Sequence, residues 1–86
     1  MNPPTSLPIY LRISELLARE IAAGHLLDGE RLPPERDLAV RFRISVGTLR
    51  KALAELTRQG LLERRQGSGN YVCARADAQN LYAFFR

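Results

Sequence analysis

The short gap between two helical patterns in the middle of the chain constrains its fold more than any other feature. In "ERDLAVRF", Leu38 and Phe42 lie four residues apart, the spacing of one helix face, and they predict a short helix over residues 34–42. A second helical pattern begins at Ser45 and runs to Gly60. About three residues separate the two patterns, and two helices joined so closely form a helix-turn-helix unit.

The residues at the ends of these two helices support this interpretation. Pro34 suits the first turn of the shorter helix, where its missing N–H has no partner to lose. Ser45 is a favourable N-cap for the second helix, and Ile44 before it can pack on Leu49 as a hydrophobic staple. Gly60 ends the second helix. The expected inward face of that helix consists of Leu49, Ala52, Leu53 and Leu56.

A longer helix precedes this unit. Over residues 8–23, apolar side chains recur at helical spacing, with Pro8 suited to the first turn and Gly24 to the left-handed residue beyond the end. These apolar residues are Ile9, Ile13, Leu16, Leu17 and Ile21. The connector that follows contains an Asp-Gly turn, and Arg31 and Leu32 are candidates for a very short strand.

Two short strands follow the second helix, "LLERR" and "NYVCA", and a glycine-rich turn joins them into a hairpin. Leu62 and Val72 are their expected core residues. This order predicts an α+β, mostly α fold: a winged helix-turn-helix with three helices plus a small β-hairpin wing. We expect this domain over residues 8–75, after a flexible N-terminal tail at residues 1–7.

Size and composition exclude several classes of function. The 86 residues suffice for one small core, and no apolar run approaches the ~18 residues of a membrane span. The start carries no signal-peptide pattern, so we expect a cytoplasmic protein. With one cysteine and one histidine, Cys73 and His25, the chain has neither an internal disulfide nor a clustered metal site. Because the sequence shows no nucleophile-base pair and no phosphate-binding loop, we expect that the protein is not an enzyme and binds no cofactor.

The charge of the chain is unevenly distributed. Residues 31–75 contain ten Arg and Lys side chains against four carboxylates, whereas residues 1–30 contain two against four. A basic central stretch is the footprint of a protein that binds a polyanion, and nucleic acid is the expected partner. The alternatives are a solvated basic face and a winged helix that only contacts an acidic protein.

The first turn of the second helix has the chemistry for reading DNA. In a helix-turn-helix, this helix lies in the major groove with its N-terminal residues at base edges. Gly47 has no side chain, so the backbone can approach the duplex, and the Ser45 and Thr48 hydroxyls can bond phosphates or bases. Arg50, one turn further, is long enough to bond guanine in two places or to clamp a phosphate.

The stretch "LPPERDLAVRFRISVGTLRKALAELTRQGLLERRQGSGNYV" resembles the DNA-binding domain of the GntR family of bacterial transcription regulators. The family pattern combines a Leu-Pro-x-Glu-Arg segment, a helix that starts at serine, and a Gly-x-Gly wing. The resemblance covers about residues 9–72. Matching positions are Leu32, Pro33, Glu35, Arg36, Leu38, Ala39, Ser45, Thr48, Arg50, Ala52, Leu53, Leu56, Gly60, Leu61, Gly67, Gly69 and Val72.

The resemblance implies DNA contacts at named positions. Arg36 approaches the duplex from the start of the shorter helix, and Gln66 and Gly67 at the wing tip reach the minor groove. Arg64 and Arg65 alternate sides of a strand, so one of the two is expected to face DNA, with Arg65 as the candidate. The full set of candidates is Arg36, Ser45, Val46, Gly47, Thr48, Arg50, Lys51, Arg65, Gln66, Gly67 and Ser68.

Two positions depart from the family pattern. Val46 stands where the family commonly has arginine, so a direct contact is lost or an apolar contact with a thymine methyl replaces it. Pro34 stands where serine is common, so the shorter helix lacks a side-chain cap. Lys51 and Arg58 are expected to attract phosphates rather than to read bases.

The end of the chain, "NLYAFFR", resembles the aromatic segment that leads into the effector-binding domain in the HutC subfamily. We therefore expect residues 76–86 to be a linker and the start of a truncated C-terminal domain. The resemblance implies a sequence-specific, double-stranded-DNA-binding domain of a ligand-responsive regulator that acts as a repressor. The implied partners are two-fold symmetric operator DNA, a second copy in a full-length homodimer, and a small-molecule effector on the missing domain.

Overall fold

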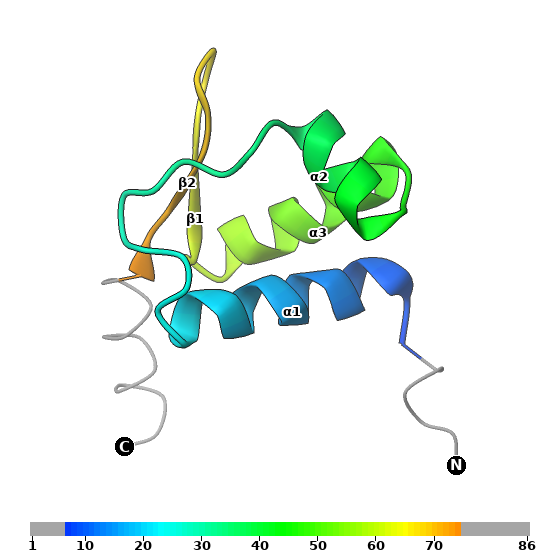
Figure 1. The fold of residues 1–86 in the computed structure, drawn as a ribbon, viewed down its shortest axis with the longest axis horizontal. Coiled ribbons are helices and arrows are strands. Elements are labelled where there is room, and N and C mark those ends of the chain that lie inside the picture. Colours follow the sequence, from blue (N-terminus) through cyan, green and yellow to red (C-terminus); the bar gives the residue numbers. More distant parts are fainter. Residues whose placement is uncertain (1–6, 75–86) are drawn as a thin grey trace.

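The computed structural model describes residues 7–74, which form three helices and a two-stranded antiparallel sheet (Figure 1). The elements are α1 (Ile9–Ala22), α2 (Glu35–Phe42), α3 (Val46–Arg58), β1 (Leu62–Arg65) and β2 (Gly69–Val72). The predicted architecture of three helices and a hairpin wing is confirmed. The predicted tail, except Leu7, and the predicted linker at residues 76–86 lie outside the described residues. Within residues 7–74, no helix is long and apolar enough to cross a membrane.

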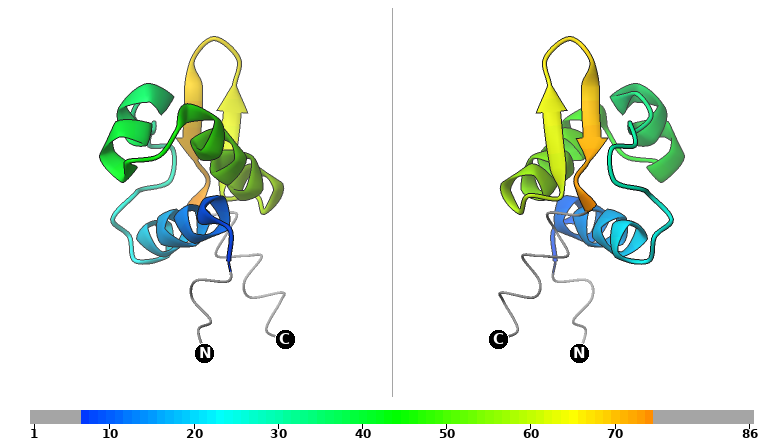
Figure 2. Two further views of the ribbon diagram at one scale, coloured as in Figure 1. Left: turned by 90° about the vertical axis from the view of Figure 1, so that its right-hand side faces the viewer. Right: turned by 90° about the vertical axis from the view of Figure 1, so that its left-hand side faces the viewer.

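Helix α3 is the centre of the fold. It packs against α1, α2 and β1, while the hairpin stands away from the helices at one end of the domain (Figures 1 and 2). All four residues of its predicted inward face are buried, and Leu49 and Leu56 are fully shielded from solvent. Leu62 and Val72 are also buried, as predicted. The base of the hairpin therefore closes the core, and only its outer part is free to reach a partner.

Helix α1 has a narrower buried face than its apolar pattern suggested. Ile13, Leu17 and Ile21 are buried, whereas Ile9 and Leu16 are 52% and 47% exposed. With 3.6 residues per turn, Ile9 and Leu16 lie at the edge of the apolar stripe, away from the centre of the buried face. Because α1 packs on α3 along one side, its buried stripe is narrower than its apolar one.

The predicted helix ends are largely confirmed. Gly24 and Gly60, which follow α1 and α3, both have a φ of +84°, the left-handed region that glycine tolerates. Pro8 and Pro34 stand one residue earlier than predicted, as N-caps with ψ of 151° and 149° rather than in the first turn. Pro34 gives α2 no side-chain cap, as expected.

The turn between α2 and α3 depends on a left-handed residue that is not glycine. Arg43 has φ of 59° and ψ of 45°, a region that side-chain-bearing residues rarely adopt. The Ile44 N–H donates to the Ala39 carbonyl at 3.0 Å, a bond typical of a Schellman helix end. The chain thus turns sharply enough for Ser45 to begin α3 across α2.

The hairpin has a third, very short neighbour. In the hairpin, Leu62 pairs with Val72. On the other edge of β2, Arg31 forms an isolated bridge with Tyr71, and the Leu32 N–H donates to the Asn70 carbonyl at 2.9 Å. The predicted short strand is therefore a single bridge. It ties the connector before α2 to the wing and so fixes where the start of α2 lies relative to it.

Candidate nucleic-acid interface

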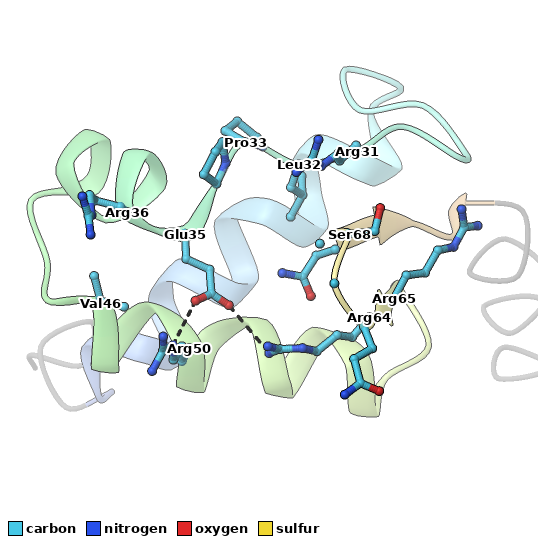
Figure 3. A pocket seen from close by; sticks show the side chains of 15 residues that line it. Arg31, Leu32, Pro33, Glu35, Arg36, Val46, Arg50, Arg64, Arg65 and Ser68 are labelled. Atoms are coloured by element: carbon cyan, nitrogen blue, oxygen red, sulfur yellow. Dashed lines mark hydrogen bonds and ion pairs between the residues drawn. The ribbon is translucent and has the colours of Figure 1, made fainter.

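A groove opens where the starts of α2 and α3 face the turn of the hairpin (Figure 3). Glu35 and Arg36 reach it from α2, Val46 from α3, and Gln66 and Gly67 from the wing tip. Its lining within residues 7–74 carries five arginines: Arg31, Arg36, Arg50, Arg64 and Arg65. This concentration of positive charge in a concave surface attracts an anionic ligand.

The start of α3 is held by its predicted cap. The Thr48 N–H donates to Ser45 Oγ at 3.0 Å, and the Ser45 hydroxyl donates to Thr48 Oγ1, also at 3.0 Å. The hydroxyl of Ser45 is thus used within the protein, while the hydroxyl proton of Thr48 remains available for an acceptor outside it. Gly47 is exposed between them, so the backbone of this turn is accessible.

Arg50 and Arg64 meet at one carboxylate. Arg50 Nε donates to Glu35 Oε1 at 2.9 Å, and Arg64 Nη1 lies 3.7 Å from Glu35 Oε2 (Figure 3). These contacts join α2, α3 and β1, which are far apart in sequence. The side chain of Glu35 is 21% exposed, whereas those of Arg50 and Arg64 are 65% and 67% exposed. Both arginines therefore remain largely open to a ligand.

The wing is ordered by its own side chains. The Arg65 guanidinium lies over the Tyr71 ring, 4.1 Å from its centroid, and the hydroxyls of Ser68 and Tyr71 are hydrogen-bonded. Gly67 has a φ of +76°, and apart from Gly67 itself and its two chain neighbours no described atom lies within 4 Å of the position that a Cβ would take there. The tip is therefore a tight turn with an unobstructed outer surface, which suits insertion into a narrow groove.

The structure brings most of the predicted site residues together. Arg36, Val46, Arg50, Arg65, Gln66, Gly67 and Ser68 line the groove. Of the other predicted residues, Ser45 is the N-cap of α3, and Gly47 and Thr48 lie in its first turn, next to the groove. Lys51 lies elsewhere, because its ammonium is 5.9 Å from the centroid of the Tyr10 ring on α1.

Three charged residues of the groove were missing from the predicted set. Strand alternation predicted that one of Arg64 and Arg65 faces DNA, with Arg65 as the candidate, yet both line the groove. The Arg64 guanidinium lies near Glu35, whereas the Arg65 guanidinium lies over the Tyr71 ring. Arg31 arrives from the connector through its bridge to β2, and Glu35 through packing of α2. The basic excess over residues 31–75 was the sequence signal for Arg31, whereas Arg64 was the alternative to Arg65 on the same strand.

The three described groups with a shifted pKa, Glu55, Arg58 and Cys73, lie outside the groove lining. At the end of α3, hydrogen bonds from Arg58 and Gln59 lower the pKa of Glu55 from 4.5 to about 2. Burial raises the pKa of the Cys73 thiol. Within residues 7–74, no three His, Cys, Asp or Glu side chains gather in a group that could hold a metal ion.

The helix-turn-helix, the wing and the arginine-lined groove between them define a winged-helix DNA-binding domain. Residues 9–72 match the family described as "Bacterial regulatory proteins, gntR family". The chain therefore belongs to the GntR family of bacterial regulatory proteins, as its motifs predicted.

Curated relatives agree with this assignment. The chain is 64% identical over 81 residues to the HTH-type transcriptional regulator SmoD of Agrobacterium fabrum, a match that spans 94% of this chain and 35% of SmoD. It is 43% identical over 65 residues to the mannosyl-D-glycerate transport/metabolism system repressor MngR of Escherichia coli, spanning 76% of this chain and 27% of MngR. The chain thus covers about a third or less of the length of these two relatives.

Solved structures confirm the fold. The DNA-binding domain of AraR in complex with operator ORX1 superposes with a TM-score of 0.77 and 35% identity, over 84% of this chain and 87% of that one. A GntR family transcriptional regulator from Listeria monocytogenes superposes with a TM-score of 0.81 and 28% identity, over 93% of this chain and 72% of that one.

Proposed function

We propose that the groove binds double-stranded operator DNA in a sequence-specific manner. The observation that carries this proposal is that Val46 and Arg50 of α3 and Gln66 and Gly67 of the wing line the same groove. One duplex can therefore receive α3 in its major groove and the wing tip in the adjacent minor groove, the docking geometry of helix-turn-helix proteins with an added arm. The AraR complex supports this choice, since the matched domain there is bound to an operator.

The residues divide into two roles. Arg50 reads a base, because a guanidinium can bond both the O6 and N7 of guanine, and Val46 supplies an apolar contact for a thymine methyl. Arg36, Arg65 and the first turn of α3 grip phosphates and position the domain without reading sequence. Lys51, on the Tyr10 side of α3, contributes to the general attraction of the polyanion.

We further propose that this domain belongs to a longer cytoplasmic repressor of the HutC type. In that protein, two copies bind two half-sites, and a small molecule on a C-terminal domain changes the affinity for the operator. Support comes from the short share of SmoD and MngR that the chain covers, from the name of MngR as a repressor, and from the aromatic "NLYAFFR" segment. On this proposal the protein regulates transcription and catalyses no reaction.

Selection of bound sequences from a random pool of duplexes tests the proposal. We expect the selection to enrich one sequence motif. In a gel-shift titration at increasing salt, the affinities for the selected duplex and for random DNA should both fall steeply, while the selected duplex remains the tighter ligand. A winged helix that serves only as a protein-binding module gives no enriched motif and equal affinity for all duplexes. That result would refute the proposed function.

A further inference from the structure

Glu35 carries a negative charge in a surface that is proposed to bind the negatively charged backbone of DNA. Within residues 7–74 it is the one acidic side chain among the residues that line the arginine-rich groove. A carboxylate at this position repels the phosphates that the neighbouring arginines attract, so on its own it lowers affinity for any duplex. The proposed function by itself gives Glu35 no role, and the role inferred for it rests on that function.

The contacts of Glu35 show what it does instead. Its two oxygens engage two different arginines, Arg50 through Nε at 2.9 Å and Arg64 through Nη1 at 3.7 Å. A guanidinium has five N–H donors, and the bond to Nε leaves the two terminal nitrogens of Arg50 free. These terminal nitrogens are the ones that form the two parallel bonds with guanine.

We propose that Glu35 is a positioning residue that sets sequence discrimination: it aims the free end of Arg50 at a base edge and withholds Arg50 and Arg64 from phosphates. At a correct site, Arg50 bonds guanine while it keeps its bond to Glu35. On random DNA, the two arginines have only phosphates to bind. A phosphate there must either displace the Glu35 carboxylate from the arginines or lie close to its negative charge, and both weaken binding. Glu35 therefore weakens non-specific binding more than specific binding.

The test compares Glu35→Gln with Asp37→Asn in the 86-residue chain. Both substitutions remove one negative charge from the first turn of α2, but Asp37 lies outside the groove lining. In Glu35→Gln, we expect random DNA to bind more tightly, with a salt slope steeper by about 1, and the preference for selected over random duplex to fall about tenfold. In Asp37→Asn, both affinities rise together and the preference stays within about twofold of the original.

A second variant separates position from charge. Glu35→Asp keeps the negative charge, but its shorter side chain cannot reach Arg50 and Arg64 together. We expect this variant to lose discrimination, with a gain in affinity for random DNA that is smaller than in Glu35→Gln, because the negative charge remains beside the released arginine. In an Arg50→Ala background, Glu35→Gln is expected to change the preference far less than in the original chain, because the group that Glu35 aims is gone.

Three results would contradict the inference. Each is measured only on variants that far-UV circular dichroism and the thermal unfolding midpoint show to be folded. If Glu35→Gln and Asp37→Asn change specific and random binding alike, Glu35 acts only through its charge and the inference is wrong. The inference is also wrong if Glu35→Gln lowers the preference for the selected duplex equally in the original chain and in the Arg50→Ala background. If the unsubstituted chain has no preference among duplexes, the proposed function itself fails, and the inference fails with it.

Discussion

The inner and outer faces of α3 differ in the interactions that stabilise them and in their exposure to solvent. Leu49 on the inner face is fully shielded from solvent, while Arg50, the next residue, has a side chain that is 65% exposed. The inner face is held by apolar packing against α1 and β1, and the outer face by a cap and by ion pairs at Glu35. Stability and recognition are thus separated on one helix, and substitutions on the two faces should affect different measurements.

The largest effect is expected on the inner face. Leu49→Ala leaves a cavity at a fully shielded site and should lower the free energy of unfolding by ~3–5 kcal/mol. Urea denaturation followed by circular dichroism measures this loss. Leu16→Ala on α1 removes the same atoms from a side chain that is 47% exposed and should cost well under half as much. Equal losses would show that α3 is not the centre of the core.

The next effect is expected on the outer face. Arg50→Ala should weaken binding to the selected duplex by ~1–3 kcal/mol and relax the preference at one base pair, with little change in the unfolding free energy. Gel-shift titration against single-base variants of the selected site measures both. An equal loss on selected and random DNA would mean that Arg50 holds phosphates rather than reading a base.

A smaller effect is expected where the two faces meet, at the cap of α3. Ser45→Ala removes the acceptor of the Thr48 N–H and should reduce the unfolding free energy by ~1 kcal/mol. Ser45→Asn, which offers another capping oxygen, should retain most of that stability in the same denaturation experiment. A Ser45→Ala protein as stable as the original would show that the cap contributes nothing.

The smallest effect concerns acid stability at the far end of α3. The pKa of Glu55 is lowered from 4.5 to about 2 by its bonds to Arg58 and Gln59, so its contribution is complete above about pH 4.5 and disappears as the pH falls toward 2. Glu55→Gln should therefore flatten the dependence of unfolding free energy on pH across this window. DNA binding at pH 7 should not change, since Glu55 lies outside the groove lining.

Local chemistry decided what the sequence could predict. Helix ends at Ser45, Gly24 and Gly60 depend on neighbouring residues, and the structure confirms them. The exposure of Ile9 and Leu16 depends on how much of the α1 surface α3 covers, and the sequence of α1 alone does not determine this.

The same limit applies to the groove. Residues of the first turn of α3 and of the wing tip were predictable because they belong to one continuous motif. Glu35 carries a motif match, yet its bond to Arg50, fifteen residues away, exists only after α2 and α3 pack. Arg31 likewise joins the groove through a bridge to β2 that spans forty residues of sequence.

The central claim is that the start of α3 and the wing tip bind the same duplex. Titration of the ¹⁵N-labelled chain with the selected duplex tests it most directly, with the backbone amides as reporters. We expect the Val46 and Gln66 resonances to shift together with one dissociation constant, while those of Arg12 and Arg19 on the outer side of α1 stay in place. Shifts confined to α1, or shifts of Val46 without Gln66, would contradict a single groove that holds both elements against DNA.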